Sequence, residues 1–536
     1  MARIIAPDFD KYDVVSCDVF DTLLFRNSVY PKNLWRRKGK FFKFFRPKAE
    51  FAARCLGRIK GKEEISIEDI YRFMKPIWAT SKEIELEESS LVVNTEVLEW
   101  LNLALANGKR IILISDTYLS SEVMKSFLLK LNVPNFEIIT SSSLGKTKSK
   151  NLFPYLIAEE GISPENWLHI GDNHIADVER PSEFGIHTFL YTPIFKQLLL
   201  TGVVSKKGFK KLARSAKGQV ALTAAANDLL QIDTASKSSD NFLPEIIGTI
   251  VLAPVALEIA RWVGELAIEL NVQLVCFIGR DGWLPFTAYR KISFETPVTY
   301  LETSRKAIGA TLFQEYLGMK IGSSESVLIY DIGWRGSGLA KMQHTFKDIS
   351  WHGAFLALVR SSNKNESTYF SRFGKNWWWA IGNRDVLETL FSDEKESTVG
   401  YNDNLSPIRS STNSDSPQEL RKTVVRAAIN AISNFKTGRT EVGRISLLEM
   451  LCKFPSAQFA TLFIGSSHQV ADSRSRPFLV NSFPLLRENI DVSWWPGTRA
   501  LKPQKLFTGT AWMFFSRIQQ LRYGLKSALR KLRISL

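Results

Sequence analysis

Cysteine is scarce in this chain. The 536 residues include only four cysteines, which are Cys17, Cys55, Cys276 and Cys452. They form no CxxC pair, so neither a disulfide framework nor a zinc site is indicated. Free thiols suit a reducing cytoplasm, where we expect the protein to be located. The opening residues, MARIIAPDFDKYD, also lack the basic-then-apolar order of a secretory signal.

Long apolar runs are missing as well. The longest apolar stretch, 246–257 (IIGTIVLAPVAL), lies between Glu245 and Glu258. A helix that spans a bilayer needs about 20 apolar residues. We therefore expect a buried helix at 246–257 and no transmembrane segment.

Acidic residues are absent from three basic stretches of a chain whose net charge is +16. Residues 31–48 hold eight basic side chains and five aromatics, residues 202–217 hold six basic side chains, and nine basic residues follow Asp491. Such patches attract polyanions or anionic lipid headgroups, and a solvated surface is an equal alternative. Residues 510–536 mix basic, aromatic and aliphatic side chains, which favours an interfacial helix at the inner face of the cytoplasmic membrane. No recognisable nucleic-acid module accompanies the patches, so we expect no nucleic-acid partner.

The apolar pattern predicts an α/β protein with two α/β regions, because short apolar runs alternate with helical patterns. The expected strands are 12–20, 110–118, 136–143, 166–173 and 187–193, and then 273–279, 298–303, 326–333 and 353–360. We expect a first domain over 1–200, with a helical cap over about 27–105, a basic linker over 201–240 and a second α/β domain over 241–400. Residues 401–417 are expected to form a polar loop, and the rest, to 536, a basic and mostly helical region.

Polar side chains follow the expected strands of the first domain. Asp18 and Ser115 end two of these strands, Lys148 lies in the polar stretch GKTKSKN, and Asp172 and Asp177 follow a third strand in IGDNHIAD. Ligands bind outside the carboxyl ends of strands in open α/β sheets, so these positions are predicted to converge. A carboxylate can attack phosphorus, a hydroxyl and a lysine can neutralise phosphoryl oxygens, and further carboxylates can hold Mg²⁺.

This set resembles the four motifs of the haloacid dehalogenase (HAD) superfamily, in their usual order. The resemblance implies a Rossmann-like catalytic domain with a helical cap and the following roles. Asp18 would be the nucleophile, Ser115 and Thr22 would bind the phosphoryl group and Lys148 would orient it. Mg²⁺ would bind to Asp18, to the backbone carbonyl of Phe20, to Asp172 and to Asp177.

Two positions depart from the family pattern. HAD phosphatases usually carry a general-acid Asp two residues after the nucleophile, where this chain has Phe20, as in the dehalogenase branch. Asp21 is the next carboxylate and is our candidate for the acid, while metal binding needs only the backbone at Phe20. The active-site lysine also stays open, since Lys146, Lys148 and Lys150 are neighbours.

Three turns that suit phosphate follow strands of the second region. They are GRDG (Gly279, Arg280, Asp281, Gly282), the pair Ser304 and Arg305, and DIGWRGSG (including Asp331, Gly333, Arg335, Gly336, Ser337, Gly338). Glycine-rich turns expose backbone N–H groups to phosphate, and arginine adds planar cationic donors. Glycines that merely make tight turns in a Rossmann-like domain are the alternative.

The three turns resemble a type I phosphoribosyltransferase core. The resemblance implies that GRDG cradles pyrophosphate, that Asp331 faces the ribose hydroxyls and that Gly336, Ser337 and Gly338 hold the 5-phosphate of phosphoribosyl pyrophosphate (PRPP). Asp281 and Asp331 would be its catalytic acids. The family's loop has two consecutive acids and a Thr-rich end, whereas here Tyr330 precedes a single acid and Ser337 replaces Thr.

Together the two regions resemble HAD proteins of bacterial polysaccharide gene clusters, and bifunctional enzymes that install ribofuranose in glycans. The implied function is phosphoribosyl transfer from PRPP to a glycan or glycolipid acceptor, followed by removal of the 5-phosphate. A HAD phosphatase with a non-catalytic binding domain is the alternative. A phosphatase that processes nucleic acid ranks last.

Overall fold

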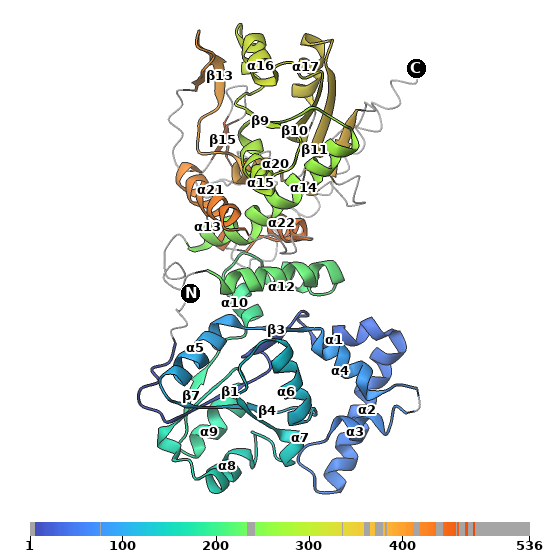
Figure 1. Ribbon diagram of the computed structural model, residues 1–536, viewed down its shortest axis with the longest axis vertical. Coiled ribbons are helices and arrows are strands. Elements are labelled where there is room, and N and C mark those ends of the chain that lie inside the picture. Colours follow the sequence, from blue (N-terminus) through green and yellow to red (C-terminus); the bar gives the residue numbers. More distant parts are fainter. Residues whose placement is uncertain are drawn as a thin grey trace, which may run out of the picture. The chain divides into compact units, whose positions relative to one another are not determined.

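The computed structural model describes residues 6–75, 77–232, 242–334, 336–358, 365–369, 379–380, 383–410, 417–435, 443–456, 458–459, 462, 467–469 and 475–477. The chain divides into two compact units. Unit 1 comprises 1–201 and 210–240, and unit 2 comprises 202–209 and 241–536. Each unit contains its own five-stranded parallel sheet, so the mixed α/β class predicted from the sequence is confirmed (Figure 1).

The sheet of unit 1 has the strand order β5-β4-β1-β6-β7. Its strands are β1 (Val14–Asp18), β4 (Arg110–Ser115), β5 (Glu137–Thr140), β6 (Trp167–Gly171) and β7 (His187–Leu190). Residues alternate between the faces, so Val15 and Cys17 pack into one apolar cluster and Val14 and Ile112 into another. Both faces are therefore covered, which explains the continuous apolar runs of these strands.

The helices and short turns that accompany this sheet follow the strands in chain order. They are α5 (Thr95–Ala106), α6 (Ser121–Lys130), α7 (Ser141–Leu144), α8 (Leu152–Glu160), η2 (Pro164–Asn166), η3 (His174–Glu179), α9 (Arg180–Glu183) and α10 (Ile194–Leu200). Residues 141–143, expected to continue a strand, instead begin α7. Thr140 is still extended, and the helix begins at Ser141, whose hydroxyl donates to the Thr117 carbonyl and accepts from the Thr117 N–H.

A helical insertion lies between two short strands, β2 (Leu24–Arg26) and β3 (Leu91–Val93), which pair antiparallel. The cap expected over about 27–105 therefore ends before β3, and α5, which that range included, packs on β4 of the sheet. The elements of the cap are α1 (Pro31–Leu34), η1 (Trp35–Lys38), α2 (Lys40–Ile59), α3 (Ile67–Tyr71) and α4 (Thr80–Glu88). Arg46 on α2 is fully buried and binds Glu83 on α4, so a charged pair holds the cap helices together.

The region expected to be a basic linker is folded. It contains α11 (Lys206–Leu212) and α12 (Ala216–Leu230), and residues 210–232 belong to unit 1. Helix α12 begins where the Ser215 hydroxyl accepts a hydrogen bond from the Gly218 N–H. Helix α12 buries alanines and leucines such as Ala221, Ala225 and Leu229. The segment therefore folds because of the apolar face of this helix, despite the lysines that precede it.

The sheet of unit 2 has the strand order β12-β11-β10-β8-β9. Its strands are β8 (Leu274–Ile278), β9 (Val298–Leu301), β10 (Ser326–Trp334), β11 (Ser350–Leu358) and β12 (Glu366–Thr368). The first four match expected strands, whereas β12 was not predicted. The helices around the sheet are α13 (Phe242–Ile246), η5 (Ile247–Leu252), α14 (Ala253–Glu269), η6 (Arg280–Gly282), α15 (Trp283–Ile292), η7 (Ala307–Gly309), α16 (Phe313–Ile321), α17 (Ser337–Thr345) and α20 (Arg384–Phe391).

The continuous helix from Phe242 to Glu269 is long and apolar enough to cross a membrane by length and composition. The most apolar window of this helix is 78% buried inside the protein. Gly264 packs so closely on Phe294 that a Cβ at position 264 would lie 2.4 Å from that ring. This packing is that of a core helix, as expected for 246–257.

The region after residue 400 differs from the expected loop. Strand β14 (Pro407–Arg409) pairs antiparallel with β13 (Thr398–Tyr401). Helices α21 (Pro417–Ser433) and α22 (Arg444–Lys453) and the strands β15 (Ser467–Gln469) and β16 (Ser475–Pro477) follow. The expected interfacial helix at 510–536 lies outside the described residues, as does Arg335.

Candidate active site

Three carboxylates meet where the strand order of the unit 1 sheet reverses. Asp18 is the last residue of β1, and Asp172 and Asp177 follow the neighbouring strand β6. The chain leaves β1 toward β4 and β5 on one side and returns to β6 and β7 on the other, and the carboxyl ends of strands at such a reversal are where open α/β sheets bind ligands. One ligand atom from each carboxylate lies within 4.8 Å of the others.

Lys148 joins this group from the turn between α7 and α8. Its Nζ atom lies 2.6 Å from Oδ1 of Asp18 and 2.5 Å from Oδ1 of Asp177, and the side chain is 3% exposed. Lys146 instead lies 5.1 Å from the ring centre of Tyr155, and Lys150 is exposed. Of the three neighbouring lysines, the structure therefore brings Lys148 to the carboxylates.

Asp177 is held rigidly by groups of β6 and η3. Oδ1 of Asp177 lies 3.1 Å from Nε2 of His169, and Oδ2 accepts a hydrogen bond from the Asn173 N–H. Nδ1 of His169 in turn lies 2.7 Å from the Ser16 hydroxyl on β1. A Cβ at Gly171 would lie 2.3 Å from the Asp177 carboxyl carbon, so only glycine fits between β6 and this side chain. No sequence pattern marks His169 as a residue that orients Asp177.

Burial and charge repulsion govern the protonation of the cluster. Burial raises the pKa of Asp18 well above its ordinary value; the Lys148 ammonium opposes this shift, and Asp177 adds to it. Burial, together with the carboxylates of Asp21 and Asp177, raises the pKa of Asp172 to about 7. At Asp177 the attraction of Lys148 and His169 outweighs burial and lowers the pKa.

A divalent cation fits this donor set. Three carboxylates share one lysine, so the group carries excess negative charge that a cation would offset. Mg²⁺ prefers hard oxygen ligands such as these. Asp18, Asp172 and Asp177 are therefore the protein groups that could hold it, and Phe20, whose backbone carbonyl was the further predicted ligand, lies two residues after Asp18.

Ser115 ends β4, beside β1, with its hydroxyl unused. The side chain is 1% exposed, and its Oγ atom has no hydrogen-bond partner among the described residues. An unpaired buried hydroxyl costs free energy, so this group would gain from a hydrogen bond to a ligand oxygen. This observation agrees with the predicted role of Ser115 in binding a phosphoryl group.

Thr22 and Asp21 border the cluster in the turn after β1. The Thr22 hydroxyl donates to Oδ2 of Asp18 at 3.4 Å, so Thr22 contacts the predicted nucleophile. Asp21 adopts a positive φ of 63°, and its N–H donates to the Leu24 carbonyl, which fixes the turn. Burial raises the pKa of Asp21, while Arg26 opposes the shift. A raised pKa suits a proton donor near neutral pH.

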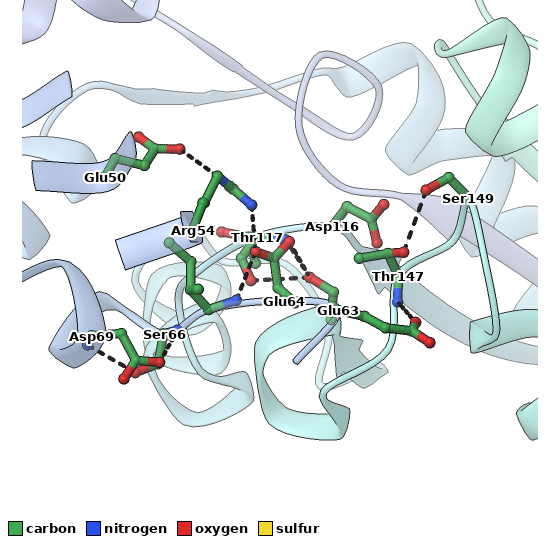
Figure 2. A network of polar contacts seen from close by, with 12 residues as sticks. Glu50, Arg54, Glu63, Glu64, Ser66, Asp69, Asp116, Thr117, Thr147 and Ser149 are labelled. Carbon is green, nitrogen blue, oxygen red and sulfur yellow. Dashed lines mark hydrogen bonds and ion pairs between the residues drawn. The ribbon is translucent and has the colours of Figure 1, made fainter. Parts of the chain in front are cut away.

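A polar network from the cap fixes the loops that carry the catalytic groups (Figure 2). Oε1 of Glu64 accepts from Arg54 at 2.8 Å, and Oε2 accepts from the Ser141 hydroxyl at 3.4 Å. Ser141 Oγ also accepts from the N–H of Thr117, two residues after Ser115. Glu64 is buried, and so is its partner Ser141, whereas Arg54 is partly exposed.

The same part of the cap holds the lysine turn. Glu63 accepts hydrogen bonds from the Thr147 N–H at 3.3 Å and from the Asn151 side chain. Oδ1 of Asp116 accepts from the Lys148 N–H at 2.9 Å. The residues on both sides of Lys148 are therefore tied to the cap or to the end of β4. Sequence reasoning did not find Glu63 or Glu64, because their partners lie some 80 residues away in the chain.

Glu64→Ala is expected to lower the kcat of the predicted phosphatase reaction by about 10- to 100-fold, because small misplacement of catalytic groups has effects of this size. The Mg²⁺ requirement should stay unchanged, since Glu64 contacts no predicted metal ligand. Glu64→Gln should restore part of the activity by keeping an acceptor for Ser141. The control is Glu68→Ala, at an exposed site on α3. Unchanged kcat in a variant with native circular dichroism would contradict the positioning role.

In unit 2 the predicted acids also lie at a reversal of the strand order. Asp281 follows β8 and Asp331 lies near the end of β10, its neighbour, while β9 and β11 extend the sheet to either side. Burial, the neighbouring Glu388 and then Asp331 raise the pKa of Asp281 well above its ordinary value. Burial raises the pKa of Asp331 to about 7, the N–H of Gly333 lowers it, and Glu388 raises it. The carboxylates of Asp281, Asp331 and Glu388 are thus near enough to repel one another.

Glu388 was missed by sequence reasoning. It lies on α20, which contacts the GRDG turn, and no motif precedes it that could have marked it. Asp393, just after α20, donates its N–H to the Arg280 carbonyl, and its carboxylate accepts from the Tyr300 hydroxyl at 3.2 Å. Tyr300 donates as well to the Gly279 carbonyl. The loop after α20 therefore fixes the GRDG turn.

The residues of the predicted turns in unit 2 differ in the contacts that they make. Gly333 has a φ of 115°, and a Cβ there would lie 2.2 Å from the Ala357 carbonyl oxygen, so glycine is required. Ser304 uses its hydroxyl locally: it donates to the Thr398 carbonyl and accepts from the Ala307 N–H. Its predicted role as a phosphate ligand stays a prediction beside this role in forming the turn. Arg305 beside it is exposed.

The remaining predicted residues of this site are placed as follows. Gly279 and Gly336 have positive φ values of 70° and 64°, and each opens a turn into a helix. Ser337 and Gly338 begin α17, with Ser337 exposed. Gly282 is buried under Phe277, and Arg280 is half-buried beside Asp281. The structure brings GRDG and Asp331 together, while the Ser304 hydroxyl bonds within its own turn.

Comparisons with known proteins concern the N-terminal part. No protein-family model matches the chain, and no curated protein sequence matches it. Among solved structures, a HAD family enzyme from Bacteroides thetaiotaomicron, in complex with magnesium and inorganic phosphate, is 18% identical; the match covers 34% of this chain and 95% of that one, with a TM-score of 0.27. A HAD phosphatase from Thermococcus onnurineus is 17% identical over 34% of this chain and 86% of that one, with a TM-score of 0.24.

Proposed function

We propose that unit 1 is a Mg²⁺-dependent phosphatase of the HAD type, with Asp18 as nucleophile. The observation that carries the proposal is the combination of a buried nucleophile paired with Lys148 and the buried, unpartnered hydroxyl of Ser115. A nucleophile, a cation and a free donor at one crevice suit a tetrahedral phosphate group. The carboxylates supply the site for Mg²⁺, which would neutralise phosphoryl oxygens when bound.

The reaction uses the residues in two steps. An oxygen of Asp18 attacks phosphorus, the bond from phosphorus to the leaving alcohol oxygen breaks, and Asp21 gives that oxygen a proton. Water then attacks phosphorus, gives a proton to Asp21, and releases phosphate as the bond to Asp18 breaks. Ser115 and Lys148 hold the phosphoryl oxygens through both steps. The cycle returns every group to its starting state.

Asp172→Asn tests the metal site. Replacing a charged carboxylate ligand with a neutral amide should raise the Mg²⁺ concentration for half-maximal phosphatase activity by about 100-fold. Titration calorimetry should show the same loss of Mg²⁺ affinity, independently of activity. Glu179→Gln, an exposed position on η3, serves as the control. Wild-type turnover in excess chelator, or unchanged Mg²⁺ affinity in Asp172→Asn, would contradict the assignment.

For unit 2 we propose phosphoribosyl transfer from PRPP to a saccharide acceptor of a glycan or glycolipid. Support comes from Asp281 and Asp331 at the strand-order reversal and from the glycine turns that precede α15 and α17. Carboxylates accept hydrogen bonds from ribose hydroxyls, and glycine turns present N–H groups to phosphate. The sugar product would keep its 5-phosphate, which unit 1 would remove.

The experiment is incubation with PRPP, Mg²⁺ and candidate saccharide acceptors while pyrophosphate and phosphate are followed separately. Transfer followed by dephosphorylation should release both, with pyrophosphate first. PRPP that yields no pyrophosphate with any acceptor would contradict transfer.

The three acids of unit 2 favour a second candidate, a saccharide-binding unit without transferase activity. Asp281, Asp331 and Glu388 repel one another and the phosphates of PRPP, whereas neutral sugar hydroxyls can donate to all three. Saccharide binding that persists without PRPP and without pyrophosphate release would select this candidate.

A further inference from the structure

The outer face of α2 exposes a row of large apolar side chains. Phe41, Phe51 and Ile59 are 76%, 72% and 83% exposed, and Phe44 and Phe45 are 57% and 45% exposed. At 100° per residue these five positions lie within one arc of about 120°, along the whole helix. The opposite face carries the buried residues Phe42, Arg46, Ala49, Ala53 and Gly57.

Such a face is unusual for a protein surrounded by water. Single exposed apolar residues are common, but a contiguous row of aromatics generally marks an interaction surface. Twenty residues make α2 about 30 Å long. The row continues onto the segment after α3, where Phe73 and Ile77 are exposed and Trp78 packs against Phe45.

The charges around this row are of one sign. Lys40, Lys48 and Arg58 are exposed on α2, Lys43 is half-buried, and Arg37 and Lys38 are exposed just before it. The Lys48 ammonium lies 3.7 Å from the ring centre of Phe44, so cation and aromatic share one surface. Glu50 is the one acid in the α2 sequence, and it is engaged by Arg46 and Arg54.

We propose that this face of α2 docks on a membrane surface that contains anionic phospholipid. The helix would lie in the plane of the interface, with its phenylalanines at the boundary between headgroups and acyl chains and its lysines among the phosphates. Aromatic insertion and basic attraction are the two contributions that such binding requires, and both are present on one face. This inference does not depend on the function proposed for either unit.

Charge complementarity favours lipid over other occupants. A second copy of the chain would bring two basic faces together, because an isologous contact uses the same surface twice. The segment after Asp491 is also basic, with nine basic and no acidic residues, and would be repelled in the same way. An anionic bilayer matches the charge and provides an apolar layer for the aromatics.

The test is co-flotation of the full chain with vesicles of phosphatidylcholine alone or with phosphatidylglycerol added. Wild type should bind the anionic vesicles and bind phosphatidylcholine weakly. Phe41→Ser/Phe44→Ser/Phe51→Ser should weaken partition at least ~10-fold, since each buried phenylalanine contributes substantially. Lys40→Glu/Lys43→Glu/Lys48→Glu should weaken it by about fivefold per lysine.

Matched controls come from exposed sites elsewhere in unit 1. Leu103→Ser/Leu105→Ser/Leu129→Ser removes apolar residues of 53%, 47% and 53% exposure, and Lys11→Glu/Lys125→Glu/Lys196→Glu changes exposed lysines. Both controls should partition like wild type. The proposal is overturned if wild type does not bind anionic vesicles, or if the α2 variants, shown to be folded by circular dichroism, bind as wild type does. It is also overturned if sedimentation shows a dimer that the α2 variants break while vesicle binding stays unchanged.

Discussion

Asp18→Asn is expected to abolish phosphate release from a phosphate monoester, with a loss of at least ~10³-fold in kcat. An amide oxygen is a poor nucleophile toward phosphorus, so no acyl phosphate forms. The fold should persist, because the substitution removes one of two carboxylates that compete for Lys148 and leaves the contact with Asp177 in place. Thermal unfolding should therefore occur at a temperature no lower than in wild type.

The control for this variant lies just before the same strand. Asp13→Asn changes an exposed residue just before β1, where its carboxylate accepts from the Asn166 side chain. It should retain wild-type kcat. Phosphatase activity within tenfold of wild type in Asp18→Asn would exclude Asp18 as nucleophile.

The first site could be predicted because its polar residues lie at the ends of apolar strands. Asp18, Asp172 and Ser115 follow apolar runs, and parallel strands bring their carboxyl ends to one edge of a sheet. The sequence does not distinguish the active-site lysine among Lys146, Lys148 and Lys150, since the choice depends on the conformation of the turn that carries them. That turn is fixed by Glu63 of the cap, a contact between residues 84 positions apart. Long-range contacts of this kind leave no local pattern in a sequence.

Helix α2 shows a second limit. Its sequence places phenylalanines on both sides, and hydrophobicity alone would turn the aromatic-rich side inward. The structure turns Ala49, Ala53 and Arg46 inward instead, because Arg46 pairs with Glu83 at 2.6 Å and small residues let the cap helices approach. The buried ion pair between Arg46 on α2 and Glu83 on α4 thus determines which face of α2 stays exposed. Glu388 was missed for a similar reason, since only folding brings α20 to the GRDG turn.

The two proposed activities are expected to be separable by mutation. Each site is built on its own sheet in its own unit, so a substitution in one should leave the other intact. With PRPP and a saccharide acceptor, Asp18→Asn should stop at a product that keeps its 5-phosphate and is heavier than the wild-type product by one phosphate group. Asp331→Ala should lower pyrophosphate release by about 10³-fold or more, because the ribose hydroxyls lose a buried acceptor whose absence leaves them unpaired.

Phosphoribosyl transfer should precede removal of the 5-phosphate. Pyrophosphate can leave the anomeric carbon only from PRPP, and the 5-phosphate is the group that the turn before α17 would hold. Hydrolysis of a pre-made phosphoribosyl saccharide should therefore proceed normally in Asp331→Ala. Asp348→Ala, at an exposed site before β11, is the matched control and should retain both activities. Mass spectrometry of the acceptor decides the outcome: a dephosphorylated ribosyl product from Asp18→Asn, or pyrophosphate release at the wild-type rate from Asp331→Ala, would contradict the division of labour between the units.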